Sequence, residues 1–281
     1  METILFILAP IAVGLILGID RKVTAHMQNR VGPPIIQPFY DLVKLFGKRT
    51  MVMNNGQIIF AVSCLVFQAL ALALLVNEGD LLVVFFLSGA GSVSLVLGAF
   101  SAGSPYSFYG SQRELLQILA YEPVLLLVIL LIGYDQGTLT VSKLNGSMLP
   151  GLGLAALSLV LVLVIKLQKS PYDVATAHQE IVSGPYVEYS GPYLGVTKLA
   201  HWFELAIVLG ILTLLFWNAN SAISIGGKVL LVAAAIFATQ VIDNASARLT
   251  RGRMVKFTLF AGIALVAVNM LGVYLSKQGV I

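Results

Sequence analysis

The chain has 281 residues, of which 58% are hydrophobic and only 11% are charged, with a mean hydropathy of +0.92. This composition excludes an ordinary soluble globular domain and is typical of a protein with several transmembrane helices. The net charge of +4 does not indicate nucleic-acid binding, because the basic residues are distributed as membrane topology requires.

Eight apolar runs are each long enough, at roughly 20 residues, to cross a hydrocarbon core of about 30 Å as a helix. Helices also pair their own backbone N–H and C=O groups where no water is present. The sequence therefore predicts an all-α, polytopic membrane protein with about eight transmembrane helices, forming a single integral membrane domain over residues 1–281. The predicted helices are 3–19, 58–76, 81–100, 115–134, 151–168, 194–217, 225–242 and 257–275.

Lys and Arg residues lie mainly on one side of this topology. Fourteen of the 17 fall in or beside the connections after the first, third, fifth and seventh helices, and Lys143, Lys228 and Lys277 fall on the other side. By the positive-inside rule, the main polar loops are cytoplasmic and both termini lie outside a plasma (cell) membrane. No clear cleavage site follows Gly18, so we expect the first helix to remain in the mature protein.

The connection after the first helix contains a second kind of element. Gly32, Pro33 and Pro34 break the chain, and apolar residues then recur at helical spacing over 35–46. This pattern predicts an amphipathic helix at the membrane surface, whose simplest role is that of an interfacial anchor.

The fourth predicted helix carries two carboxylates with different expected roles. Ser111 and Glu114 have the spacing of a capping box, so we expect Glu114 to cap the start of the helix. Glu122 lies about 16 Å further along the helix than Ser111 and therefore near the middle of the membrane. Pro123, which follows it, removes one backbone hydrogen bond and leaves a carbonyl in need of a polar partner.

Thr197, His201 and Glu204 form one stripe of the sixth predicted helix, with Lys198 on the neighbouring row. An ionised carboxylate at this depth costs at least a few kcal/mol unless it faces a partner or water. Two interpretations remain open: a buried ion pair of Glu204 with Lys198 or His201, or a proton-accessible group on a polar path. Lys166, at the end of the fifth helix, is expected to snorkel to the surface.

A polar segment, DVATAHQEIVSGPYVEYSGPY at 173–193, separates the fifth and sixth helices. Its prolines discourage a continuous helix, so it is predicted to be a cytoplasmic loop that dips toward the membrane. Its ionisable residues are Asp173, His178, Glu180 and Glu188. Asp243, in contrast, is expected to be part of an ordinary helix terminus.

Cys64 is the only cysteine, so this chain cannot by itself build a disulfide or a four-thiolate iron–sulfur site. His26, His178 and His201 are far apart and belong to no HExxH-like pair, which argues against a metal site. We therefore expect no cofactor in this chain.

Six motifs stand out in the cytoplasmic connections and the helices beside them. They are DRK at 20–22, RVGPP at 30–34, QPFYDLVKLF at 37–46, YE at 121–122, SPYD at 170–173 and QEIVSGPYVEYSGPY at 179–193. Together they resemble the membrane subunit that adjoins the electron-transfer arm in respiratory complex I. The same subunit occurs in formate hydrogenlyase and in energy-converting NiFe hydrogenases of the Ech type, and the sequence resembles the Ech branch most.

The resemblance implies a non-catalytic subunit docked under a hydrophilic arm. The 4Fe-4S clusters and the NiFe centre would lie in partners, namely hydrogenase large and small subunits and iron–sulfur proteins, beside antiporter-like membrane subunits. Arg21, Lys22 and Arg30 would belong to the arm interface. A chain of carboxylates, Glu122, Asp173, Glu180 and Glu188, would lead into the membrane. To these we add Glu204, His178 and His201 as candidate members of a proton relay.

Departures from the complex I pattern favour the hydrogenase branch over a quinone site. The stretch between Gly32-Pro33 and Gln37-Pro38 is short, Thr176 and His178 stand where that family has acids, and Ala200 replaces a glutamate. We therefore expect an arm-anchoring subunit that couples ferredoxin-driven hydrogen evolution to proton or sodium translocation. The alternatives are a quinone-site subunit of a complex I-like oxidoreductase, a passive membrane anchor and a stand-alone solute carrier.

Overall fold

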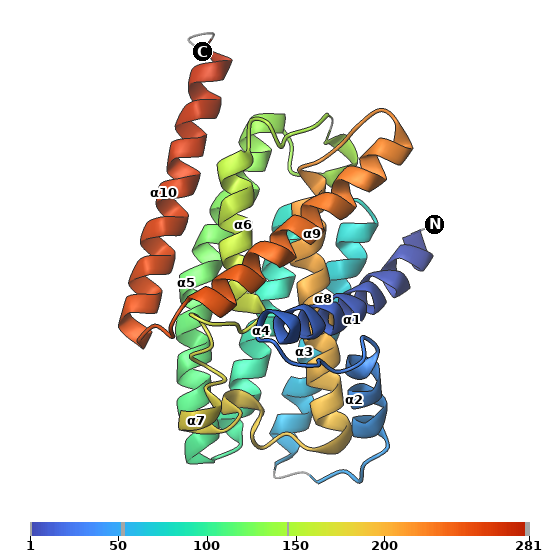
Figure 1. Cartoon of the computed structure of the whole chain (residues 1–281), viewed down its shortest axis with the longest axis vertical. Coiled ribbons are helices and arrows are strands. Elements are labelled where there is room, and N and C mark those ends of the chain that lie inside the picture. Colours follow the sequence, from blue (N-terminus) through green and yellow to red (C-terminus); the bar gives the residue numbers. More distant parts are fainter. Residues whose placement is uncertain (1, 52–53, 145, 279–281) are drawn as a thin grey trace.

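A computed structural model describes residues 2–51, 54–144 and 146–278 of the chain (Figure 1). Apart from one isolated bridge between Asp80 and Thr140, the regular structure of these residues is helical. The α-helices are α1 (Glu2–Met27), α2 (Gln37–Phe46), α3 (Asn55–Val76), α4 (Leu81–Ser101), α5 (Pro105–Gln136), α6 (Gly153–Lys166), α7 (His178–Ile181), α8 (Gly191–Leu214), α9 (Ser221–Ala245) and α10 (Arg251–Lys277).

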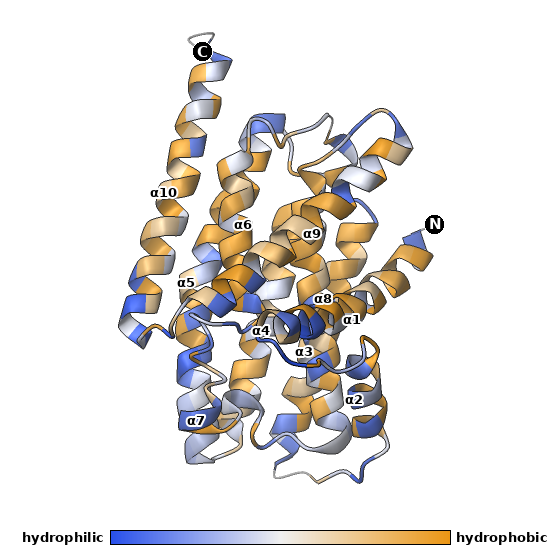
Figure 2. Cartoon of the chain, viewed as in Figure 1, coloured by the Kyte–Doolittle hydropathy of each residue, from blue (hydrophilic) through white to orange (hydrophobic). Residues whose placement is uncertain are grey.

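The predicted all-α membrane architecture is confirmed. Seven of the described helices are long and apolar enough to cross a membrane, namely α1, α3, α4, α5, α8, α9 and α10. Figure 2 shows hydrophobic residues along their lengths, with hydrophilic residues gathered mainly near the helix ends and in the connections.

The fifth predicted helix is shorter than expected. α6 has only 14 residues, which span about 21 Å and thus less than a hydrocarbon core of about 30 Å. It packs among α5, α8, α9 and α10, and its last residue, Lys166, is buried. Irregular backbone at membrane depth is tolerated in such a protein-lined position.

The predicted surface helix is confirmed as α2, which packs against α1 and α8. Leu42 is buried, and the ring of Phe39 meets that of Trp202 edge-on with 5.2 Å between centroids. Val43 on the same helix is 71% exposed. One side of α2 therefore packs on the bundle, while part of its apolar surface is left open.

The predicted capping box at Ser111 and Glu114 is wrong, because α5 begins ten residues before the predicted start at 115. Pro105 occupies the first turn, where its missing N–H costs nothing. Ser111 thus lies inside the helix, where its hydroxyl donates to the Ser107 carbonyl at 2.6 Å. The first ten residues of α5 were not predicted to be helical, because they are polar and pack on protein, so they form no apolar run.

The connection between α6 and α8, residues 167–190, lies along α5 (Figure 1). At the point of closest approach, a Cβ added to Gly110 of α5 would lie 2.4 Å from the Gly184 backbone. Gly184 itself has a φ of 55° and leaves no room for a Cβ beside the Ala175 carbonyl. The two glycines therefore allow the polar connection to press against the helix.

Gly110→Ala is expected to destabilise the protein by about 1–3 kcal/mol, because the new methyl group cannot fit without moving the Gly184 backbone. The matched control is Gly272→Ala, since nothing lies within 4 Å of a Cβ there. Thermal unfolding and the rate of proteolysis within 167–190 measure the effect. Equal melting temperatures and equal cleavage rates for the two variants would refute the close packing.

Candidate functional site

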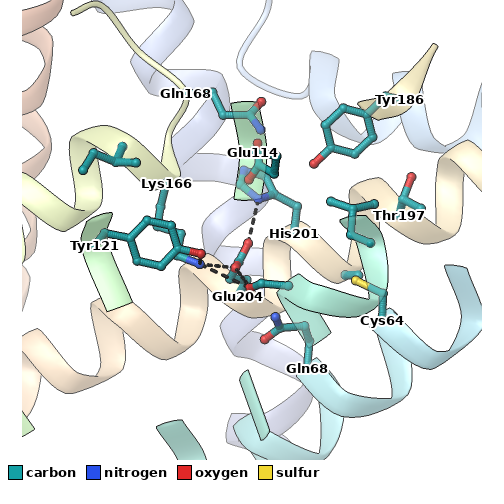
Figure 3. Close-up of a pocket in the computed structure, with 14 residues that line it drawn as sticks. Cys64, Gln68, Glu114, Tyr121, Lys166, Gln168, Tyr186, Thr197, His201 and Glu204 are labelled. Atoms are coloured by element: carbon teal, nitrogen blue, oxygen red, sulfur yellow. Dashed lines mark hydrogen bonds and ion pairs between the residues drawn. The ribbon is translucent and has the colours of Figure 1, made fainter. Parts of the chain in front are cut away.

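A buried polar cluster joins α4, α5, α6 and α8 (Figure 3). Lys166 donates a hydrogen bond to Oε1 of Glu204 and another to the Tyr121 hydroxyl at 2.6 Å. Ser92 donates to the same Glu204 oxygen at 2.6 Å, and Nδ1 of His201 lies 3.1 Å from Oε2. The Lys166 and Glu204 side chains are only 6% and 13% exposed. We refer to these five residues as the lysine–glutamate cluster.

Lys166 was expected to snorkel to the surface, and that prediction is wrong. Because α6 has only 14 residues, its last residue lies inside the bundle and the side chain does not extend to the bulk solvent. Three features stabilise the ammonium group there: the Glu204 carboxylate, the Tyr121 ring with its centroid 4.0 Å away, and the C-terminal end of the α6 dipole.

Of the two partners proposed for Glu204, the structure confirms His201 and contradicts Lys198. Lys198 is exposed, and six positions along a helix place it about 120° around the axis from Glu204. The predicted stripe is confirmed, because Thr197, His201 and Glu204 line the same small cavity.

That cavity has a volume of about 20 Å³, which is room for one water molecule. Glu114 lines it together with Lys166, and its Oε2 is buried without a hydrogen-bond partner among the described residues (Figure 3). Sequence reasoning assigned Glu114 to helix capping and so missed it. The available signal was its spacing of seven residues from Tyr121, which puts both side chains on one face of α5.

A second cavity, of about 340 Å³, lies between the 167–190 connection and α8. His178 and Lys198, both exposed, form part of its wall. The two cavities share Gln168, Tyr186 and His201 as lining residues. His201 therefore faces the outer cavity as well as the carboxylate of Glu204.

Two of the predicted loop carboxylates form a separate ionic network. Asp173 accepts two hydrogen bonds from Arg248, at 2.8 and 2.5 Å. Glu180 lies 2.6 Å from Arg113 of α5 and 3.6 Å from Arg248. The hydrogen bonds to Asp173 raise the pKa of Arg248 above its usual range, so this guanidinium stays charged. The network fastens the connection to α5 and to the segment before α10.

The remaining predicted carboxylates lie apart from the lysine–glutamate cluster. Glu122 is half-buried beside Gly89 of α4, and its Oε1 has no hydrogen-bond partner among the described residues. Glu188 is half-buried in a narrow cleft with Tyr189 and Gln57. Neither residue lines the two cavities described above.

A second buried ion cluster was not anticipated. The ammonium group of Lys169 lies 2.5 Å from Asp20 of α1 and 3.7 Å from Asp243 of α9. Gln240 donates to Asp20 at 3.2 Å, and Asp243 accepts from the Ser170 backbone N–H at 3.1 Å. Asp243 is therefore more than a helix terminus, because it helps to hold α1, α9 and the polar connection together.

The three residues predicted for an arm interface, Arg21, Lys22 and Arg30, are all exposed. Arg21 lies 3.2 Å from Asp41 of α2, and both side chains are accessible. Among the residues that the structure describes, no group of three His, Cys, Asp or Glu side chains is placed to hold a metal ion.

Comparisons with known proteins all find subunits of membrane-bound oxidoreductase complexes. A family model described as NADH dehydrogenase matches residues 1–274. Hydrogenase-4 component C of Escherichia coli (strain K12) is 29% identical over 231 residues, which cover 76% of this chain and 72% of that protein. Formate hydrogenlyase subunit 4 of the same organism is 27% identical over 254 residues, covering 83% and 81%.

One solved structure that resembles this chain is a subunit of the membrane-bound sulfane sulfur reductase, an archaeal respiratory membrane complex. It superposes with a TM-score of 0.83 at 28% identity, over 97% of this chain and 98% of that chain.

Proposed function

Because the chain belongs to the NADH dehydrogenase family of respiratory membrane subunits, we propose that it anchors the electron-transfer arm of an Ech-like, hydrogen-evolving complex. The names of its relatives hydrogenase-4 component C and formate hydrogenlyase subunit 4 support this branch. In this proposal, hydrogenase large and small subunits carry the NiFe centre and the iron–sulfur clusters, and reduced ferredoxin supplies electrons. Antiporter-like membrane subunits beside the chain move protons or sodium ions.

The observation that carries the proposal is the link between an outer cavity and a charged pair at membrane depth. His201 lines the outer cavity and contacts Glu204, and Glu204 in turn pairs with buried Lys166. A proton that enters beside His178 can therefore pass to His201, because an imidazole ring has one nitrogen that can donate a proton and another that can accept one. Protonation of His201 changes the charge facing Glu204 in a poorly solvated site, where such a change has a large effect.

The polar connection supplies a physical route from the arm to this pair. Thr176, His178 and Ser183 of the connection form part of the outer cavity wall. The same connection is fastened to Arg113 and Arg248 through Glu180 and Asp173, two of its three carboxylates. A change of charge in a docked arm would alter these ion pairs, of which Glu180 is the most exposed member, and thereby shift the cavity wall.

Glu114 extends the proposed relay beyond the residues found by sequence. Glu114 lines the small cavity that Lys166 and Glu204 also line, and its Oε2 has no hydrogen-bond partner among the described residues. One water molecule in that cavity would join the two carboxylates by hydrogen bonds. The proton-bearing groups of the proposal are thus His178, His201, Glu204 and Glu114, with Asp173 and Glu180 as sensors of the arm.

Glu204→Gln is expected to lower ion uptake per hydrogen evolved by at least about tenfold, because the amide cannot take up a proton. The measurement compares hydrogen evolution from reduced ferredoxin with ion uptake in membrane vesicles that hold the assembled complex. Glu122→Gln and Glu180→Gln test the other predicted positions. Glu78→Gln, at an exposed residue between α3 and α4, is the matched control.

Wild-type hydrogen evolution and wild-type ion uptake in the Glu122, Glu180 and Glu204 variants would rule out the relay. Altered assembly with intact coupling in whatever assembles would instead support a passive membrane anchor. In this way the two functions make opposite predictions for the same set of variants.

A second candidate function differs in the electron acceptor. The solved structure that matches this chain belongs to a sulfane sulfur reductase, and a cavity of about 340 Å³ is also within the range that holds small ligands, quinone head groups included. Activity of the purified complex with protons, sulfane sulfur or quinone as acceptor distinguishes the branches. A co-purifying large subunit with two CxxC pairs would identify the hydrogenase.

A further inference from the structure

An apolar groove of about 730 Å³ runs between α1, α8 and α9. At one end, marked by Gln240, it comes close to the buried ion pair of Asp20 and Lys169. Small residues form much of its surface, including Ala9 and Ala12 of α1, Gly210 of α8 and Ala233 of α9. Because these side chains are short, three neighbouring helices leave an open trough instead of a closed contact.

The groove is elongated along α9. On α9 the lining runs from Lys228 to Gln240, which is about 18 Å at 1.5 Å per residue.

The length fits a lipid acyl chain. Half of a hydrocarbon core of about 30 Å is about 15 Å, the depth that the chains of one leaflet fill. The lining is almost wholly apolar over that length, with branched residues such as Ile16 and Val232 between the small ones. An extended hydrocarbon chain would therefore meet hydrocarbon along the whole groove.

The two ends of the groove differ in charge. Gln240 lies at one end of the groove, where its side-chain N–H donates a hydrogen bond to Asp20 at 3.2 Å. Lys228, half-buried at the other end, has no carboxylate partner among the residues that the structure describes. An ammonium group there needs an anion or water, and the phosphate of a lipid head group would supply the anion.

We propose that the groove binds one anionic phospholipid, with an acyl chain along α9 and its phosphate on the Lys228 ammonium. The lipid would fill the space between α1 and α9 close to the point where Gln240 meets Asp20. This proposal depends on the groove alone and is independent of the redox partner or the ion that the complex moves.

The test measures lipid retained by the purified complex after exchange into detergent with phosphatidylglycerol or phosphatidylcholine, by native mass spectrometry. Wild type is expected to retain one phosphatidylglycerol in preference to phosphatidylcholine. Lys228→Gln should lower phosphatidylglycerol retention about fivefold, the usual contribution of one basic residue, whereas Lys228→Arg should keep it. The charge control is Lys256→Gln at an exposed residue of α10.

Ala233→Phe should block the groove and release lipid of both kinds, whereas Ala234→Phe, at an exposed neighbour that does not line the groove, should not. Equal retention in these two variants would overturn the proposed site. Equal binding of both lipids with no effect of Lys228→Gln would overturn the phosphate contact. An isoprenoid that Ala233→Phe releases in place of a phospholipid would identify a different occupant and overturn the proposal.

Discussion

Lys166→Met is expected to destabilise the protein by about 3–5 kcal/mol, because the change leaves the Glu204 carboxylate buried without its opposite charge. The Tyr121 hydroxyl and ring lose the ammonium group at the same time. Thermal unfolding in detergent and the yield of assembled complex measure the loss. This is one of the two largest effects that the structure predicts.

The double variant Lys166→Met/Glu204→Gln separates the structural role of the pair from its proposed function. Replacing both charges removes the unpaired carboxylate, so most of the stability should return. Ion uptake should remain low, because neither new side chain takes up a proton. A double variant with both stability and ion uptake restored would contradict the assignment of Glu204 to the relay.

Lys169→Met is expected to have an effect of similar size, about 3–5 kcal/mol, for a related reason. Asp20 is 7% exposed, and Lys169 is the cation that lies between its carboxylate and that of Asp243. Without the ammonium group, two carboxylates face one another in a poorly solvated position. We expect α1, α9 and the start of the 167–190 connection to separate, which increases proteolysis of that connection.

Two further variants calibrate this result. Asp20→Asn in the Lys169→Met background should restore part of the stability, because the remaining carboxylate of Asp243 is more accessible, at 23% of its side chain. Arg21→Met breaks a surface pair whose side chains are 50% and 43% exposed, so it should cost less than about 1 kcal/mol. Equal melting temperatures for Lys169→Met and Arg21→Met would show that the buried cluster does not stabilise the fold.

Most helices could be predicted because a helix that crosses lipid needs about 20 consecutive apolar residues, and such runs are visible in the sequence. Where part of a helix packs on protein instead of lipid, the hydropathy pattern did not predict where the helix begins and ends. The first turns of α5 are polar, yet Ser107, Gly110 and Ser111 are buried beneath the 167–190 connection. α6 is shorter than its apolar run, and its last residue, Lys166, is buried among other helices.

The candidate site was predicted in part. Glu204 and His201 stand out in the sequence because ionisable groups are rare within apolar runs and share one helix face. Lys166 and Glu114 were given ordinary roles at helix ends, since the sequence contains no sign of where those ends lie in three dimensions. Asp173, Glu180, Glu122 and Glu188 remain candidates for the relay, although the structure places them outside the two linked cavities.

By itself, the sequence determined the all-α membrane class, the family and the positions of the ionisable groups within the helices. These properties depend on local composition, helical spacing and short motifs, and the family match over residues 1–274 confirms the resemblance. Only the tertiary structure decided which charges pair. Lys166 and Glu204 are 38 residues apart, and Asp20 and Lys169 are 149 apart. A buried charge is stabilised by the nearest opposite charge in space, and in this bundle that charge comes from another helix or from the polar connection.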